Sequence, residues 1–360
     1  MGLFQRYVFI SFFKYIFIVG LFVNLMSLIS STMGESKDLS KYDYSIIDFI
    51  MLQGYNMALH FNLIMPAIPT IAAVIVIIIL MRSNELLAYV SLGGTITKLA
   101  VPFITVGIIM SSFMILWEYH VIPKVRVDRE ELRDKMQGKK YNRIAVYNDI
   151  WMMDANNKII NIKFIDMIGK TINGITQYNI NNEFTITKIE KINEAVKVSN
   201  GWKISNFETL DVSSNPPKIT NEASKIVQNH LWDDLMKVAV VDVRALSPTQ
   251  LSTLSNIMAK HGMSTNKYDM LYYSKYANAI SVIVLLILVF PIAINFSRNY
   301  SIVKNAAVTI VLGLLFWVVQ ASCYSLGDTG LLSPFLSNFL PLITFVIISS
   351  VIIYFRQYKR

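Results

Sequence analysis

The chain has 360 residues, of which 54% are hydrophobic and only 16% are charged, and its formal net charge is +9. A soluble protein usually carries charge on about a quarter of its residues, so this composition argues against an ordinary soluble enzyme and favours a membrane protein. The basic residues form no patch interleaved with aromatic side chains, which argues against nucleic-acid binding.

Six apolar segments are long enough to span a bilayer, which needs about 20 apolar residues per helix. They occupy residues 7–33, 63–81, 99–117, 276–297, 305–326 and 331–355. Residues 121–268, in the polar stretch between the third and fourth segments, contain 21 of the 33 Lys and Arg residues and 16 of the 24 Asp and Glu residues. We therefore predict a membrane α-helical protein with six transmembrane helices in a 3+3 layout. The expected domains are residues 1–120, 121–268 and 269–360.

Basic residues in the short links predict the orientation of these helices. If the six helices alternate in direction, all of these residues lie on one side, which the positive-inside rule makes cytoplasmic. They are Arg6, Arg82, Lys98, Arg298, Lys304, Arg356, Lys359 and Arg360. Both termini are then cytoplasmic, and the domain at 121–268 lies on the opposite side of the membrane.

The external domain has the pattern of β-structure. Residues 159–165, 184–198 and 202–212 are alternating or rich in β-branched residues, and Asn200-Gly201 predicts a hairpin turn between the last two. No helical period is evident before residues 248–261, where Leu251, Leu254 and Met258 share one face. These patterns predict a β-sandwich or an open roll. Its apolar interior is equally compatible with an acyl-chain site and with an ordinary closed core.

The link between the second and third spans predicts a short helix at residues 83–93, parallel to the membrane. Ser83 or Asn84 is placed to cap its N-terminus, and Glu85 suits the positive end of the helix dipole. Leu86, Tyr89 and Val90 share a face, and Gly93-Gly94 ends the helix. Such a helix is suited to docking a separate motor subunit, although a simple interfacial turn gives the same pattern.

Several short motifs occur in an order that resembles one known family. They are Arg6-Tyr7, the prolines Pro66 and Pro69, residues 82–87 with the glycines that follow, Pro123, residues 201–204, residues 245–247, and Tyr268 with Tyr273-Ser274-Lys275. Together with the 3+3 layout, they resemble the LptF/LptG permeases of the lipopolysaccharide exporter over nearly the whole chain. Of the two paralogues the chain looks more like LptG, because of the Lys37 region and the Tyr-Ser-Lys sequence. One departure is Asn84, which stands where the family pattern has Ser.

This resemblance implies a permease subunit of an ATP-driven exporter in the bacterial inner membrane. It implies a periplasmic β-jellyroll domain, a paralogous permease partner, an LptB-like ATPase dimer docked on the link helix, and transfer of lipopolysaccharide to LptC and LptA. The lipid is expected to enter between span one of one permease and span five of the other. The chain has no P-loop, so it needs no cofactor of its own and ATP is hydrolysed by the partner. It also lacks an intramembrane series of ionisable residues, which argues against a proton-driven transporter.

The candidate substrate-binding residues fall into two groups. Lys37 and Lys41 are suited to lipid phosphates, or else are solvated and paired with neighbouring acids such as Glu35. The resemblance further implies that apolar residues of spans one and five line the lipid cavity. The candidates are Phe22, Leu25, Met26, Phe316 and Val319, each of which could equally face bilayer lipid or pack against another helix.

The candidate ATPase-coupling residues are Arg82, Ser83, Asn84, Glu85, Leu86 and Tyr89. Glu85 is expected to reach a basic or polar groove on the ATPase. Alternatively, it only stabilises its own helix dipole, by about 0.3–1 kcal/mol. Glu118 and His120 are placed at a membrane boundary and given no special role. No catalytic or metal-binding residue is predicted.

Three other functions remain as alternatives. The chain could serve an ATP-driven exporter of another lipid or envelope cargo, which the same link helix would suit. An intramembrane hydrolase is disfavoured because no His-Glu-x-x-His sequence or paired intramembrane Asp is present. A sensor or scaffold is disfavoured because every predicted cytoplasmic segment is short.

Overall fold

The computed structural model describes two compact units. The described residues are 2–39, 45–137, 144–145, 150–154, 158–166, 170–181, 185–214, 216–229, 232–233, 243–260, 264–293 and 302–358. The helical unit comprises Met1–Leu132 and Met270–Arg360, and the β unit comprises Arg133–Asp269. The boundaries at 120/121 and 268/269, which separate the membrane segments from the external domain, stay predictions.

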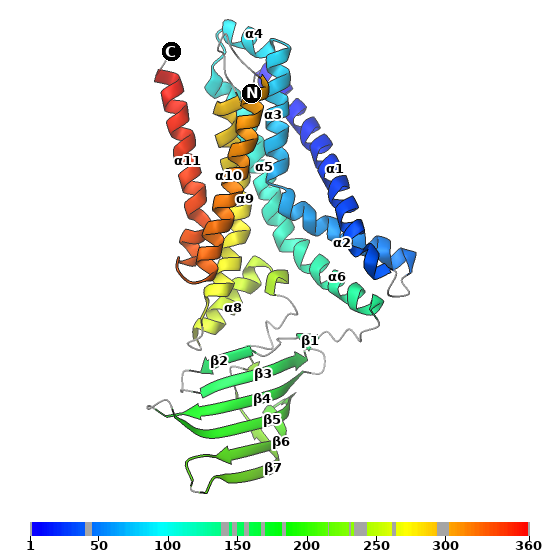
Figure 1. The fold of residues 1–360 in the computed structure, drawn as a ribbon, viewed down its shortest axis with the longest axis vertical. Coiled ribbons are helices and arrows are strands. Elements are labelled where there is room, and N and C mark those ends of the chain that lie inside the picture. The colour runs from blue at the N-terminus through cyan, green and yellow to red at the C-terminus, as the bar shows by residue number, and fades with distance from the viewer. Residues whose placement is uncertain are drawn as a thin grey trace. The chain divides into compact units, whose positions relative to one another are not determined.

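The helical unit is built mainly from long apolar helices, together with the short helix α4 and the charged helix α6 (Figure 1). They are α1 (Leu3–Leu39), α2 (Ile46–Ile64), α3 (Ala67–Arg82), α4 (Glu85–Ser91), α5 (Ile96–His120), α6 (Ile122–Met136), α9 (Asn266–Ala293), α10 (Ile302–Asp328) and α11 (Pro334–Tyr358). Within the described residues, five helices are long and apolar enough to cross a membrane, and the bent α2–α3 pair can supply a sixth span. This confirms the predicted membrane-helical fold with an inserted β domain.

The second predicted span, 63–81, is not one straight helix. Its first residues belong to α2, and the axes of α2 and α3 meet at 62°. Pro66 and Pro69 cause this difference, because a proline lacks the N–H that continues a helix. The Pro66 carbonyl instead accepts a hydrogen bond of 2.9 Å from the Thr70 hydroxyl, which satisfies a polar group at the bend.

Helix α6 was not predicted, because the sequence analysis found no helical period in the external region before residue 248. The helix is rich in charged residues, and only Ile122 and Leu132 on it are buried. Two buried residues give too weak a hydropathy period to reveal a helix from sequence.

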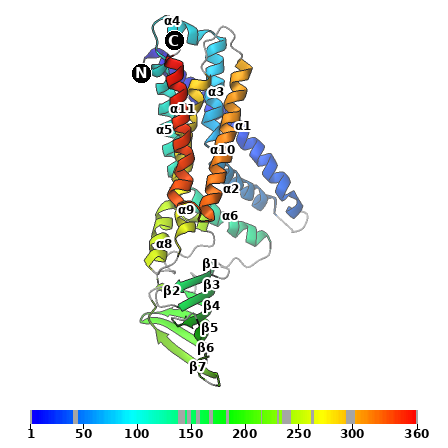
Figure 2. The ribbon, with the colours of Figure 1, turned by 60° about the vertical axis from the view of Figure 1, so that its left-hand side comes forward.

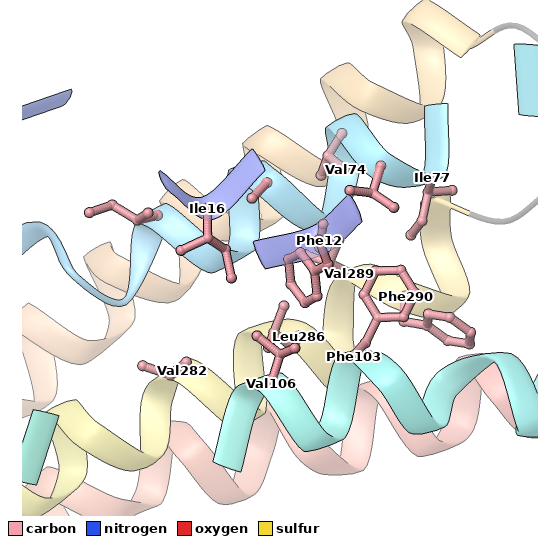
Figure 3. Close-up of a cluster of buried hydrophobic side chains, with 14 of the residues drawn as sticks. Phe12, Ile16, Val74, Ile77, Phe103, Val106, Val282, Leu286, Val289 and Phe290 are labelled. Atoms are coloured by element: carbon pink, nitrogen blue, oxygen red, sulfur yellow. The ribbon is translucent and has the colours of Figure 1, made fainter. Parts of the chain in front are cut away.

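One hydrophobic core joins α1, α3, α5 and α9, as Figure 3 shows. The Phe103 ring lies 5.0 Å from the Phe12 ring and 5.2 Å from the Phe290 ring, so three helices meet around it. At Gly107 of α5, an added Cβ would lie 3.0 Å from a Leu286 methyl group of α9, so the small residue permits close packing there. A second core joins α9, α10 and α11 around Phe316 and Phe345.

The described strands of the β unit form one antiparallel sheet. They are β1 (Ile144–Ala145), β2 (Ile150–Asp154), β3 (Lys158–Asp166), β4 (Thr171–Ile180), β5 (Ile186–Val198), β6 (Gly201–Asp211) and β7 (Lys218–Val227). The order is β1-β3-β4-β5-β6-β7, and β2 also pairs with β3. The three predicted strands correspond to β3, β5 and β6, whereas β1, β2, β4 and β7 were not predicted. All described strands belong to this single sheet, which favours the open-roll alternative over a two-sheet sandwich.

The β5–β6 hairpin is confirmed, but its turn lies one residue earlier than predicted. Val198 pairs with Gly201, so Ser199-Asn200 forms the two-residue loop. Gly201 has a φ of +137°, and an added Cβ would lie only 2.7 Å from the Val227 carbonyl oxygen of β7. Glycine is therefore required as the first residue of β6 and not within the loop.

The predicted helix after the sheet is also confirmed. Helix α8 (Pro248–Lys260) buries Leu251, Leu254 and Met258, the three residues expected to share a face. On the sheet itself, the ring of Trp202 in β6 meets the Trp232 ring edge to face at 5.7 Å.

Candidate functional site

The link between α3 and α5 forms the short helix α4, but its N-terminus is not capped as predicted. Asn84 has a left-handed backbone with a φ of 57°, and its side chain makes no capping hydrogen bond. The Ser83 hydroxyl donates to the Ile79 carbonyl at 3.0 Å and so satisfies the end of α3. Both predicted caps are therefore wrong, because Asn84 turns the chain through its left-handed backbone and the Ser83 hydroxyl bonds back to α3.

Helix α4 is anchored to the start of α1. Leu86 is 1% exposed and belongs to the main core, and the Tyr89 ring stacks on Phe4 at 4.5 Å. The Gly94 amide donates to the Tyr89 carbonyl at 2.9 Å, and an added Cβ at Gly94 would overlap the Tyr89 ring. Force applied to α4 can therefore pass directly to α1, because packed side chains transmit displacement.

The outer face of α4 contains both polar and apolar side chains. Arg82, Ser83 and Asn84 are exposed and Glu85 is partly exposed, close to the Tyr7 hydroxyl. Leu87 is 56% exposed and was missed by the sequence analysis. The adjacent pair Leu86-Leu87 signals this arrangement, because neighbouring helical residues cannot both face the same core.

The predicted cavity-lining residues of α1 face outward from this chain. Phe22, Leu25 and Met26 are 60%, 45% and 49% exposed. The two candidates on α10 differ in burial. Phe316 is 1% exposed and its ring packs on Phe345, whereas Val319 is only partly buried. The structure therefore gives Phe316 the helix-packing position that the sequence analysis held as its alternative.

The basic candidates lie at the far end of α1. Lys37 is in the last turns of α1, but its side chain lies outside the described residues. Lys41 lies wholly outside them. Their assignment to lipid phosphates stays a prediction.

A polar network that sequence analysis missed joins α1, α2 and α6 near this end. The Glu35 carboxylate accepts hydrogen bonds from Gln53 at 2.9 Å and from Asn56 at 3.1 Å. Arg129 of α6 lies 3.5 Å from the same carboxylate and donates to Asn56 at 2.5 Å. Gln53 and Asn56 are 5% and 4% exposed, so this network is largely shielded from its surroundings.

A second polar cluster lies between α5 and α9. The Lys275 ammonium donates to the Glu118 carboxylate at 2.5 Å, and Asn62 of α2 donates to its other oxygen at 2.7 Å. Both charged side chains are under 10% exposed. The prediction that Glu118 is a boundary residue without a role is wrong, because its carboxylate neutralises a buried cation 157 residues away.

Comparison of the chain with known proteins identifies its family. Residues 6–355 match the family described as lipopolysaccharide export system permease LptF/LptG. The chain is also 22% identical over 215 residues to the permease protein LptG of Escherichia coli K12, and equally to that of Escherichia coli O6:H1. That similarity covers 57% of this chain and 58% of each relative, so it spans little more than half of their length. The match over nearly all of its residues shows that the chain belongs to the LptF/LptG family of lipopolysaccharide export permeases.

Proposed function

We propose that this chain is one permease subunit of an ATP-driven exporter that extracts lipopolysaccharide from the outer leaflet of the inner membrane. The lipid is then passed to a periplasmic bridge of LptC and LptA type. The observation that supports this best is the family match from residue 6 to residue 355. The partners are a paralogous permease and an LptB-like ATPase dimer.

The exposed faces of α1 and α10 support a passage built by two permeases. On α1, Phe22, Met26 and Met33 are each about half or more exposed. On α10, Ile310, Leu314 and Val318 follow one another at four-residue spacing, at 57%, 61% and 62% exposed. Four-residue spacing gives a continuous apolar stripe, which suits acyl chains or a partner helix.

The orientation follows from the same proposal. The start of α1, the end of α11 and helix α4 lie at one end of the helical unit (Figure 1). With that end in the cytoplasm, α4 meets the ATPase and both termini are cytoplasmic. The β unit, inserted after α6, is then periplasmic.

Coupling is tested by reconstituting the chain with its paralogue and ATPase and measuring lipopolysaccharide-stimulated ATP hydrolysis. Glu85→Ala should abolish co-purification of the ATPase or uncouple it. Glu85→Asp separates the two roles of this carboxylate, because the shorter side chain still favours the helix dipole but reaches less far. Docking predicts that both variants fail, whereas a purely local role predicts that only Glu85→Ala does. Survival of complex and activity in both variants overturns the assignment.

Substrate contact is tested at Lys37. Reversing its charge in Lys37→Glu should lower the lipid-stimulated component of ATP hydrolysis, because a carboxylate repels lipid phosphates. Basal hydrolysis without lipid should stay unchanged and serves as the internal control. Unchanged stimulation contradicts a role for Lys37 in lipid binding.

An exporter of another lipid or envelope cargo is the alternative function. The exposed apolar faces suit any acyl-chain lipid, so geometry alone does not select the cargo. Mass spectrometry of lipid retained by the purified complex distinguishes the two functions. Retained lipopolysaccharide supports the proposal, and stoichiometric retention of a different lipid supports the alternative.

A further inference from the structure

One face of α1 is apolar in the inner half of the helix and polar in the outer half. Residues three or four positions apart share a helical face. The inner members of this face, all buried in the main core, are Val8, Phe12, Ile16 and Val19. Continuing from Val19 in four-residue steps, the face passes Val23 and reaches Ser27, Ser31 and Glu35. Among the described residues, α1 contributes nothing to the main core beyond Val23, so another contact holds its outer half.

Helix α2 supplies that contact with polar side chains of its own. The Ser27 hydroxyl lies 2.7 Å from Nδ1 of His60, and the Ser31 hydroxyl donates to the side-chain oxygen of Gln53 at 2.5 Å. The Asn56 amide donates to the Ser31 hydroxyl at 3.2 Å. These contacts continue into the hydrogen bonds around Glu35 described above, and together they form a polar seam. Its members are Ser27, Ser31 and Glu35 of α1, Gln53, Asn56 and His60 of α2, and Arg129 of α6.

The polar seam determines where the outer half of α1 lies. In a bilayer, hydrogen bonds between helices favour association, whereas lipid tails are as apolar as the side chains they would replace. On the side opposite the seam, α1 exposes Ile29 and Met33 at 52% and 71%. The helix has 37 residues, or about 55 Å at 1.5 Å per residue, and so exceeds the roughly 30 Å hydrocarbon core. Its outer end therefore reaches the aqueous boundary, where water can replace the hydrogen bonds of the seam.

Two ion pairs in the helical unit differ in how easily they can separate. Lys275 and Glu118 lie 2.5 Å apart with side chains 8% and 6% exposed, whereas Arg129 and Glu35 lie 3.5 Å apart with side chains 19% and 20% exposed. Arg129 also pairs with Glu130 of its own helix at 2.6 Å, so it keeps a partner when Glu35 departs. A longer, more exposed and shared pair is weaker, because water screens it. The first pair suits a permanent contact, and the second suits a contact that opens.

We propose that the polar seam is a releasable latch that sets the position of the outer half of α1. Arg129 and Asn56 are its positioning residues, because Arg129 contacts both Glu35 and Asn56 and so joins three helices. On release, the outer half of α1 leaves α2 and α6 while its inner half stays in the main core. The inner end of α1 is tied to α4 through Phe4 and Tyr89, so one helix connects the link to the latch. The latch is a property of the single chain, and only its role in transport rests on the proposed function.

The first test measures the position of α1 in the purified full chain in lipid nanodiscs. Spin labels are placed by Ile29→Cys on α1 and Leu116→Cys on α5, which are 52% and 58% exposed, in a Cys323→Ser background. Arg129→Gln and Asn56→Leu should each raise the ratio of open to closed distances about threefold to tenfold, as expected for losing one or two hydrogen bonds between helices. Lys124→Gln, on the exposed face of α6, is the matched control and should leave the distances unchanged. An unchanged distribution in both seam variants overturns the proposal, and so does an equal change in the control.

The second test locks the latch shut in the complex with the paralogous permease and the ATPase. Ser27→Cys combined with His60→Cys allows a short bis-methanethiosulfonate crosslinker to join α1 and α2, and reduction reverses the link. Crosslinking should abolish the stimulation of ATP hydrolysis by lipopolysaccharide, and reduction of the same sample should restore it. A purely structural seam predicts no loss, because the lock only preserves the closed arrangement. The matched control joins α5 to α9 by Gly107→Cys with Ile283→Cys, where an added Cβ lies 3.7 Å from the Ile283 Cα, and should keep its stimulation.

Stimulation that persists in the crosslinked seam variant overturns the latch. Failure of its two introduced cysteines to crosslink also overturns it, because Ser27 and His60 are then not in contact. The distance measurement needs no ATPase, second permease or exported lipid. If lipopolysaccharide fails to stimulate the unaltered complex, the proposed export function fails, and the distance measurement still decides whether the latch exists.

Discussion

Helices α9 and α10 follow one another in the chain and are almost equally apolar, yet they are buried to very different extents. In the most apolar window of each, 61% of α9 is buried but only 11% of α10. Val282, Leu288 and Val289 of α9 are fully buried, whereas Leu314 and Val318 of α10 are more than 60% exposed. Apolar composition therefore places both helices in the membrane but does not determine which one packs inside the protein.

The difference assigns the two helices different tasks. α9 contributes to both hydrophobic cores and supplies Lys275, so it links the first group of helices to the last. α10 packs mainly on α11, with a smaller contact to α3 (Figure 2). α9 thus acts as scaffold, and the outer face of α10 is free to meet lipid or another subunit.

The largest expected effect concerns the buried ion pair that ties α9 to α5. Glu118→Ala leaves the Lys275 ammonium buried without its counter-ion, which costs about 3–5 kcal/mol. Thermal and denaturant unfolding of the full chain in detergent measures the loss. Lys267→Ala, on an exposed lysine of the same helix, provides the control and should change little.

A double variant distinguishes lost pairing from lost packing. Glu118→Leu combined with Lys275→Met removes both charges, so it should recover most of the stability lost in Glu118→Ala. If the double variant is as unstable as the single one, the Glu118–Lys275 ion pair does not tie α9 to α5.

Next in size is a paired truncation in the two helices. Leu288→Ala in α9 opens a cavity in the second core and should cost about 2 kcal/mol or more. Leu314→Ala in α10 removes a side chain that faces outward and should stay within about 0.5 kcal/mol. Equal losses of unfolding free energy contradict the division between scaffold and free face.

Much of the fold follows from sequence because local signals determine it. Long apolar runs place the spans, Gly93 and Gly94 end α4, and the Asn-Gly pair indicates the β5–β6 hairpin. The misses share a physical cause, which is dependence on distant partners. Glu118 and Lys275 are 157 residues apart, so neither residue reveals that the other neutralises it.

The candidate site was predicted unevenly for the same reason. Spacing within α4 predicted that Leu86, Tyr89 and Val90 share a face, but not that Leu86, a predicted coupling residue, is 1% exposed in the main core. Phe316 could not be assigned from spacing, because α10 has apolar residues on all of its faces. The contact of Phe316 with Phe345 depends on α11. The bend before α3 was signalled by Pro66 and Pro69, but the size of that bend depends on how α2 packs.

A smaller effect is expected where α1 leaves the bundle. Arg129→Ala removes the contact from α6 to Glu35 and Asn56, which are partly or largely buried, and should loosen the outer end of α1. Amide exchange in residues 27–35 should quicken by up to about tenfold, equivalent to 1.4 kcal/mol. Lys124→Ala on the exposed face of α6 is the control. Unchanged exchange in Arg129→Ala shows that α2 alone holds this end.

The smallest expected effect lies in the β unit, which has a polar turn in place of the apolar helices α9 and α10. The Asp211 carboxylate accepts hydrogen bonds from the Ser213 amide at 3.0 Å and the Ser213 hydroxyl at 2.6 Å, which lower the pKa of this carboxyl below its usual value. An acid with a depressed folded-state pKa stabilises the fold above its unfolded pKa of about 3.9, and that contribution is lost as pH falls through the lower folded pKa. Protection of the Ser213 amide, corrected for intrinsic exchange, should therefore fall in acid. In Asp211→Asn the amide oxygen can still accept these bonds but does not titrate, so this pH dependence should vanish. If the variant keeps the same pH profile, the effect comes from another group. The buried amides of α9 provide the internal reference, because their protection should not change with pH in either protein.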